Sequence, residues 1–112
     1  MAEVATTKLY ENDKVIVWEM VLESGESTGV HTHHHNYFFH AIECSTIEVT
    51  DKDGNVVATH NLAKDSVMYL DLEGDELVGE EARLPATHAA RNIGTTRYRE
   101  ILVELKSADG CK

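Results

Sequence analysis

Short runs of alternating apolar and polar residues recur along the chain between turn-forming residues. A period of two is typical of β-strands that bury one face, and very little of the chain has the period of a helix. The pattern therefore predicts an all-β fold with eight strands, which are enough to close a barrel. The expected strands are 14–23, 28–34, 37–43, 46–50, 56–62, 66–70, 87–92 and 98–106.

Turn residues support this division of the chain. Asp53-Gly54-Asn55 lies between two β-prone runs and supplies residues that tolerate positive φ, as a tight hairpin requires. The segment 71–84 is different, because it is acidic, contains Gly74 and Gly79, and lacks convincing strand alternation. We expect this segment to be a surface loop or a lid at the barrel rim.

The length and composition indicate one folded domain. The 112 residues leave little room for a second core, and 42% hydrophobic with 27% charged residues is ordinary for a globular protein. We expect a single domain over residues 1–112, with its core at about 12–106.

Charge and cysteine content narrow the function further. The 20 acidic and 10 basic residues give a formal net charge of −10, which disfavours binding to nucleic acid or to a membrane surface. The first residues lack the pattern of a signal peptide, so a cytoplasmic protein is expected.

The chain has two cysteines, Cys44 and Cys111. Two are too few for a disulfide framework or a cysteine-based zinc site, and we expect Cys44 to be a small buried residue.

Four of the seven histidines lie in one short run, His31-Thr32-His33-His34-His35-Asn36-Tyr37. Successive side chains of a strand point to opposite faces, so alternation predicts that His31, His33, His35 and Tyr37 share one face. A His-x-His pair on a strand can close around one ion, and a third ligand from another strand would complete the site. Neutral imidazoles suit Fe, Zn, Ni, Cu or Mn.

Two groups of residues resemble the motifs of the cupin superfamily. Gly25, five intervening residues and then His31-Thr32-His33 match the first motif, although its usual glutamate position falls at Tyr37 or Phe38. Pro85, His88 and Asn92 follow the second motif, with a shorter spacing from the proline to the histidine than is usual. The resemblance implies a single-domain cupin, a double-stranded β-helix or jelly-roll barrel.

Among cupins, the sequence resembles the small single-domain type assigned to β-alanine degradation. That type has a similar histidine run, here 31–37, and a similar closing strand, here 100–106. The resemblance covers roughly residues 12–106. It supports the fold better than the reaction, since cupins support many kinds of chemistry on one barrel.

The resemblance also implies the metal ligands. His31, His33 and His88 would hold one divalent ion, with His35 or Tyr37 as a candidate fourth ligand. The missing glutamate favours a neutral three-histidine site, similar to the iron centres of cupin diketone and thiol dioxygenases. Iron is therefore the favoured metal, with zinc, nickel or manganese as alternatives.

The leading functional hypothesis is a metal-dependent enzyme that acts on a small organic molecule, either by iron-dependent oxygen chemistry or as a Lewis-acid lyase or isomerase. Tyr37 or His35 would be the catalytic proton-transfer group. The alternative is a binding module for a small ligand, with the metal structural or absent. The resemblance and the size of the barrel favour a homodimer.

Overall fold

The computed structural model describes residues 2–80 and 82–106. Strands with connecting turns and bends make up this part of the chain. The strands are β1 (Thr7–Glu11), β2 (Val15–Leu22), β3 (His31–Thr32), β4 (Asn36–Glu43), β5 (Ser45–Asp51), β6 (Val56–Leu62), β7 (Val67–Glu73), β8 (Glu76–Val78), β9 (Arg83–Pro85), β10 (Thr87–Asn92) and β11 (Tyr98–Leu105).

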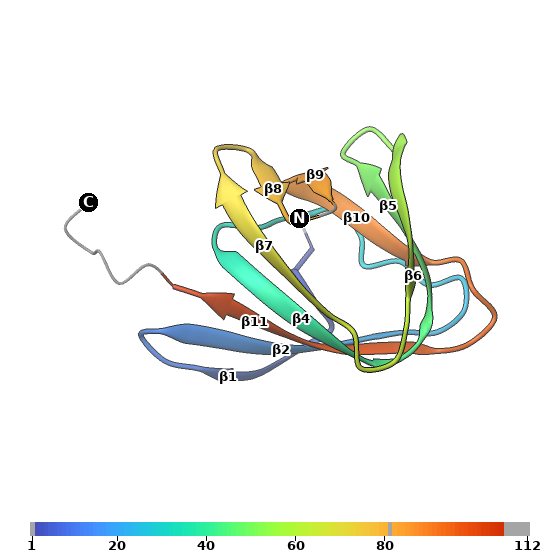
Figure 1. Cartoon of the computed structure of the whole chain (residues 1–112), viewed down its shortest axis with the longest axis horizontal. Helices are drawn as coiled ribbons and strands as arrows, with labels where there is room; N and C mark the ends of the chain where they lie inside the picture. Colours follow the sequence, from blue (N-terminus) through green and yellow to red (C-terminus); the bar gives the residue numbers. More distant parts are fainter. Residues whose placement is uncertain (1, 81, 107–112) are drawn as a thin grey trace.

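The strands form two sheets that face each other across the core (Figure 1). One sheet has the order β1-β2-β11-β4-β7-β8-β9, and the other has the order β3-β10-β5-β6. The strand pairs are antiparallel, and neighbours in a sheet are often distant in sequence, as in a jelly roll. The predicted all-β jelly-roll fold is confirmed.

Strand β11 lies in the interior of the larger sheet and pairs along its length with β2 and β4. Its burial alternates residue by residue, and this places Tyr98, Glu100, Leu102 and Glu104 on the inner face. Apolar side chains from both sheets fill most of the space opposite, including Trp18, Met20, Phe39, Leu70, Ile47 and Val49. The inner wall thus combines a hydrophobic core with two buried carboxyl groups.

The strand expected at 28–34 is mostly wrong, because only the two residues of β3 are regular strand there. Gly29 has a φ of 77°, which interrupts the extended backbone before His31. The chain leaves the strand again after Thr32 and resumes at Asn36 in β4. The side-chain alternation expected from His31 to Tyr37 is therefore broken in the middle.

The loop expected at 71–84 is also wrong for most of its length. β7 continues to Glu73, Gly74 turns the chain with a φ of 66°, and β8 and β9 complete the edge of the larger sheet. Leu77 and Leu84 from these short strands are buried in the core. The segment is therefore part of the barrel wall.

Two further expectations concern the cysteines and the membrane. Cys44 is exposed at the turn between β4 and β5, so the expectation that it is buried is wrong, and Cys111 lies outside the described residues. Among the residues that the structure describes, no helix is long and apolar enough to cross a membrane.

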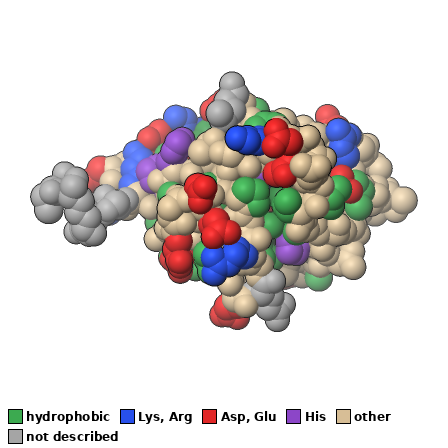
Figure 2. All heavy atoms as spheres, turned by 90° about the horizontal axis from the view of Figure 1, so that it is seen from above, with side chains coloured by type: hydrophobic (Ala, Val, Ile, Leu, Met, Phe, Trp, Pro, Cys, Tyr) green, Lys and Arg blue, Asp and Glu red, His purple; other side chains and the backbone are tan. Residues whose placement is uncertain are grey.

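Acidic and basic side chains lie interspersed on the face shown in Figure 2, with hydrophobic side chains between them. Exposed ion pairs on the molecule include Arg97 with Glu43 at 2.8 Å. Arg99 also pairs with Glu19 at 2.7 Å, where both side chains are partly exposed. Such exposed pairs are screened by water and contribute little, so packing between the sheets stabilises the fold more than surface charge does.

The side-chain amide of Asn92 joins three parts of the barrel and is fully buried. Its nitrogen donates to the Leu22 carbonyl at 2.9 Å and the Thr96 carbonyl at 2.7 Å. Its oxygen accepts from the Ser45 hydroxyl at 2.7 Å and the Gly94 amide at 2.9 Å. The end of β10 is thereby fixed to β2, β5 and the loop before β11.

We predict that Asn92→Ala lowers the free energy of unfolding by about 3 kcal/mol or more, because it leaves several buried polar groups without partners. Chemical denaturation measures the loss. Asn61→Ala is the matched control, since Asn61 is exposed and accepts one hydrogen bond, from Thr46 at 2.7 Å. Equal and small losses in both variants would contradict the structural role of Asn92.

Candidate metal centre

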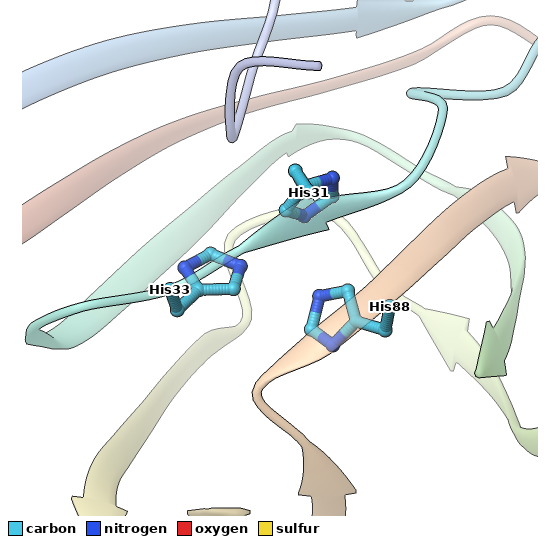
Figure 3. A group of neighbouring side chains, drawn as sticks. All are labelled: His31, His33 and His88. Carbon is cyan, nitrogen blue, oxygen red and sulfur yellow. The ribbon is translucent and has the colours of Figure 1, made fainter. Parts of the chain in front are cut away.

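Three buried histidines converge inside the barrel (Figure 3). His31 lies on β3, His88 lies opposite it on β10, and His33 follows the end of β3. Their side chains are 1%, 5% and 3% exposed respectively, and each offers one nitrogen within 4.8 Å of the others. This separation is close enough for three imidazoles to bind one metal ion.

Backbone hydrogen bonds position this cluster by fastening the segment 25–33 along β10. The amide of Thr28 donates to the Ala90 carbonyl at 2.8 Å, and the amide of His33 donates to the Ala86 carbonyl at 2.9 Å. Between these bonds, His31 and His88 pair in register. The irregular path of the chain thus still brings the histidines of distant segments together.

Hydrogen bonds also orient two of the rings. The Nδ1 atom of His31 lies 3.0 Å from the Gly29 carbonyl, and the Nδ1 atom of His88 lies 2.8 Å from the Pro85 carbonyl. A carbonyl can only accept, so both rings carry their hydrogen on Nδ1 and leave a lone pair on Nε2. Backbone carbonyls commonly fix metal-binding histidines in this way.

The third histidine, His33, is held by packing. Its ring stacks on the Tyr37 ring with centroids 4.3 Å apart and 14° between the planes. Its Nδ1 atom is buried and has no hydrogen-bond partner among the described residues. A buried nitrogen without a hydrogen-bond partner is costly for stability.

The surroundings favour uncharged imidazoles. Burial lowers the pKa of His33 to about 2, with smaller effects from His88 and His31. Burial likewise lowers the pKa of His88 to about 4, and the pKa of His31 is also below its ordinary value. Neutral imidazole is the form that binds metal, so the three groups do not need to lose protons at neutral pH.

Tyr37 lies beside the cluster and is 4% exposed. Burial raises the pKa of its hydroxyl far above the ordinary value, and the nearby Glu100 and Glu104 carboxyls raise it further. The hydroxyl therefore keeps its proton at neutral pH. In this state Tyr37 can donate a hydrogen bond to a ligand, but it cannot act as a base.

A cavity of about 60 Å³ adjoins the histidines, and most of its lining is apolar. Its further polar groups come from Tyr37, Tyr98, Glu100 and His60. The His60 Nε2 atom is buried and unpaired within the described residues. Val4 from the N-terminal segment also lines the cavity and is 8% exposed.

Glu100 is the unusual group in this lining. It is 4% exposed, and its Oε1 atom accepts a hydrogen bond of 2.6 Å from the Tyr98 hydroxyl. Burial raises the pKa of the carboxyl to about 7, although the Tyr98 hydrogen bond opposes that shift. The carboxyl can therefore change charge close to neutral pH.

Sequence comparison leaves the chain unassigned, because no family model and no curated protein sequence matches it significantly. Comparison with solved structures is informative. A cupin domain from Bordetella pertussis shares 20% sequence identity with a TM-score of 0.69, and the match covers 90% of this chain and 91% of that one. The chain has the cupin fold.

Other cupin-fold structures agree. A RmlC-like cupin family protein with a double-stranded β-helix fold from Methanocaldococcus jannaschii has 17% identity, 88% and 76% coverage and a TM-score of 0.62. An uncharacterised protein with a double-stranded β-helix domain from Klebsiella pneumoniae has 14% identity, 96% and 78% coverage and a TM-score of 0.59. At these identities the likeness establishes the fold alone.

Within this cupin fold, the structure brings together most of the residues singled out in the sequence. His31, His33 and His88 form one cluster, and Tyr37 stacks against it. His35 is partly exposed at the break between β3 and β4 and does not line the cavity. The catalytic roles proposed for Tyr37 and His35 stay predictions.

Sequence reasoning missed Glu100 and His60 as cavity residues. The pattern on β11 offered a signal, because Glu100 and Glu104 alternate with the apolar residues Ile101, Val103 and Leu105. Both faces of this strand mix apolar and charged residues, so the pattern does not reveal which face lies inside. His60 has a similar ambiguity on β6, where most neighbouring side chains are exposed.

We predict that Glu100→Gln changes the pH dependence of stability. Between the ordinary glutamate pKa of 4.5 and about 7, the folded protein keeps a proton that the unfolded chain has released. The unfolding free energy of the wild type therefore falls as the pH rises through this range. The variant should gain about 2–3 kcal/mol relative to the wild type between about pH 5 and pH 8.5. Denaturation curves at both pH values measure this; a constant offset would refute it.

Proposed function

We propose that this chain is a metal-dependent cupin enzyme that acts on a small organic molecule, with one divalent metal ion on His31, His33 and His88. The observation that carries the proposal is the convergence of these buried imidazoles within 4.8 Å, beside a cavity. Three neutral imidazoles leave coordination positions for another molecule, as in catalytic metal sites.

The details of the donor set support a metal over a purely structural cluster. The rings of His31 and His88 expose Nε2 because backbone carbonyls occupy Nδ1. Three uncharged rings that each bring one nitrogen within 4.8 Å of the others gain little by packing alone. A cation would satisfy these lone pairs together.

A metal ion bound there would polarise and orient a small molecule, or supply redox chemistry if it were iron. The protein's own residues define the rest of the reaction site. The apolar lining limits access of water, Tyr37 can donate a hydrogen bond, and Glu100 can give or accept a proton. These are the groups that a small substrate needs for proton transfer in a shielded cavity.

Iron and oxygen chemistry are our preferred form of this function, based on the similarity of a glutamate-free cluster to three-histidine dioxygenase centres. Lewis-acid chemistry with zinc, nickel or manganese uses the same residues. The resemblance to cupins of β-alanine degradation, the cytoplasmic location and the homodimer stay predictions. The same is true of the expected lack of nucleic-acid and membrane partners.

We predict that protein purified without chelators contains close to one equivalent of metal, and that His31→Ala and His88→Ala each remove most of it. Removing one of three ligands lowers the affinity of a site and leaves too few donors. Inductively coupled plasma mass spectrometry measures the content. Iron would support oxygen chemistry, while zinc, nickel or manganese would favour the Lewis-acid form.

His40→Ala is the matched control for this measurement. His40 lies on β4, its side chain is 41% exposed, and it pairs with Asp65 at 3.2 Å, away from the cluster. Its removal should leave the metal content unchanged. Circular dichroism checks that all variants fold. The proposal fails if the wild type stays metal-free after reconstitution, or if the folded ligand variants keep full metal content.

A further inference from the structure

Glu100 lies on the cavity wall without a compensating positive charge. Its neighbours in register are Met20 on β2 and Ala41 on β4, both buried and uncharged. Within the described residues, no lysine or arginine lines the cavity. An ionised carboxylate in such surroundings loses much of its hydration, so keeping the negative charge there lowers the stability of the fold.

The hydrogen bonds of Glu100 are also incomplete. Tyr98 donates to Oε1, while Oε2 has no hydrogen-bond partner among residues 2–80 and 82–106. A carboxylate can accept several hydrogen bonds. A ligand group with an N–H or O–H would supply a missing bond, and a positively charged group would also compensate the charge. The raised pKa of about 7 agrees with the lack of such a partner.

Glu104 offers a comparison on the same strand, because each of the two carboxyls accepts one side-chain hydrogen bond, on Oε1. It is equally buried, at 3% exposed, and lies four residues further along the inner face of β11. Its Oε1 atom accepts a hydrogen bond of 2.7 Å from the indole nitrogen of Trp18. Glu104 does not line the cavity, whereas Glu100 does. Glu104 therefore has a structural role in the wall, whereas Glu100 faces the space that a ligand would occupy.

The cavity also limits the size of the ligand. One water molecule takes up roughly 10–15 Å³ of such space. The cavity volume of about 60 Å³ therefore holds about four to six non-hydrogen atoms of a ligand without rearrangement. The three histidines and Glu100 all line this one cavity, so a compact molecule inside it lies near both.

We propose that Glu100 determines the specificity of the cavity, and that the substrate is a compact molecule whose hydroxyl or amine group donates a hydrogen bond to this carboxyl. The inference rests on the proposed function, in which the other end of the molecule lies at His31, His33 and His88. Once Glu100 is ionised, above about pH 7, a carboxylate group is excluded at its end of the cavity, because two negative charges would face each other without a cation between them.

Three small probes of equal non-hydrogen atom count test this assignment: ethanolamine, ethylene glycol and acetate. Each is titrated into wild type, Glu100→Gln and Glu104→Gln, with all three proteins in the same metal state. Carbon-detected NMR of the glutamate side-chain carboxyls follows binding. The Glu100 signal is identified by its absence from the spectrum of Glu100→Gln, and the dispersion of the spectra reports folding.

Ethanolamine, ethylene glycol or both should shift the Glu100 signal, and acetate should not. In Glu100→Gln the dissociation constant of the binding probe should rise about 10-fold or more, because an amide N–H then opposes the donor group. Glu104→Gln should leave it unchanged. Binding of ethanolamine alone identifies an ammonium ligand, and binding of ethylene glycol identifies a neutral donor; both support the proposal.

The proposal is overturned if none of the probes shifts the Glu100 signal, if acetate does so as strongly as the donors, or if Glu100→Gln binds as tightly as wild type. The metal content is measured on the same samples. Donor binding that depends on Glu100 in a protein that takes up no metal would refute the proposed function and keep this assignment. Full metal content without donor binding would overturn the assignment of Glu100 and leave the proposed function standing.

Discussion

The attachment of the segment 25–33 to β10 is the constraint on which the candidate site depends. Strand β3 contains only two residues, too few to stabilise a strand by themselves. Additional bonds extend the attachment in both directions: the Gly25 amide donates to the Asn92 carbonyl at 2.7 Å, and the His33 amide donates to the Ala86 carbonyl at 2.9 Å. Because of this attachment, two histidines far apart in sequence face each other at one register position.

The buried polar groups inside the barrel are of two kinds. Asn92 and Glu104 are buried polar groups with strong partners, and each connects strands of the wall. His33 and His60 each have a buried nitrogen without a hydrogen-bond partner within the described residues. Groups of the second kind gather at the cavity. Proteins commonly accept such local costs at functional sites and offset them by packing elsewhere.

The sequence predicted the long strands well because their alternation is regular. The expected ranges 37–43, 56–62 and 87–92 agree closely with β4, β6 and β10. β1 was missed because all its side chains are exposed, which leaves no apolar face to detect. β8 and β9 are three residues long, shorter than any pattern can reveal, and their pairing depends on contacts that form only after the barrel has closed.

The site was predictable only in part, for a related reason. His31 and His33 were found from local spacing, and His88 from the resemblance, whereas Glu100 carries no local signal. Alternation on β11 divides its residues into two faces, and only the three-dimensional arrangement shows that the face with glutamates points inward. For His35 only the expected alternation is wrong: a regular strand would place it on the same face as His33, but the backbone leaves the strand there.

The position of β11 between β2 and β4 also has a consequence for synthesis of the protein. β2 and β4 do not pair with each other; both pair with β11, whose residues 98–105 come much later in the chain. While the ribosome makes the intervening segments, the facing edges of these two strands stay open to other chains. Contacts so distant in sequence slow folding. The nascent protein is therefore most prone to aggregate, and most dependent on chaperones, in the interval before β11 emerges.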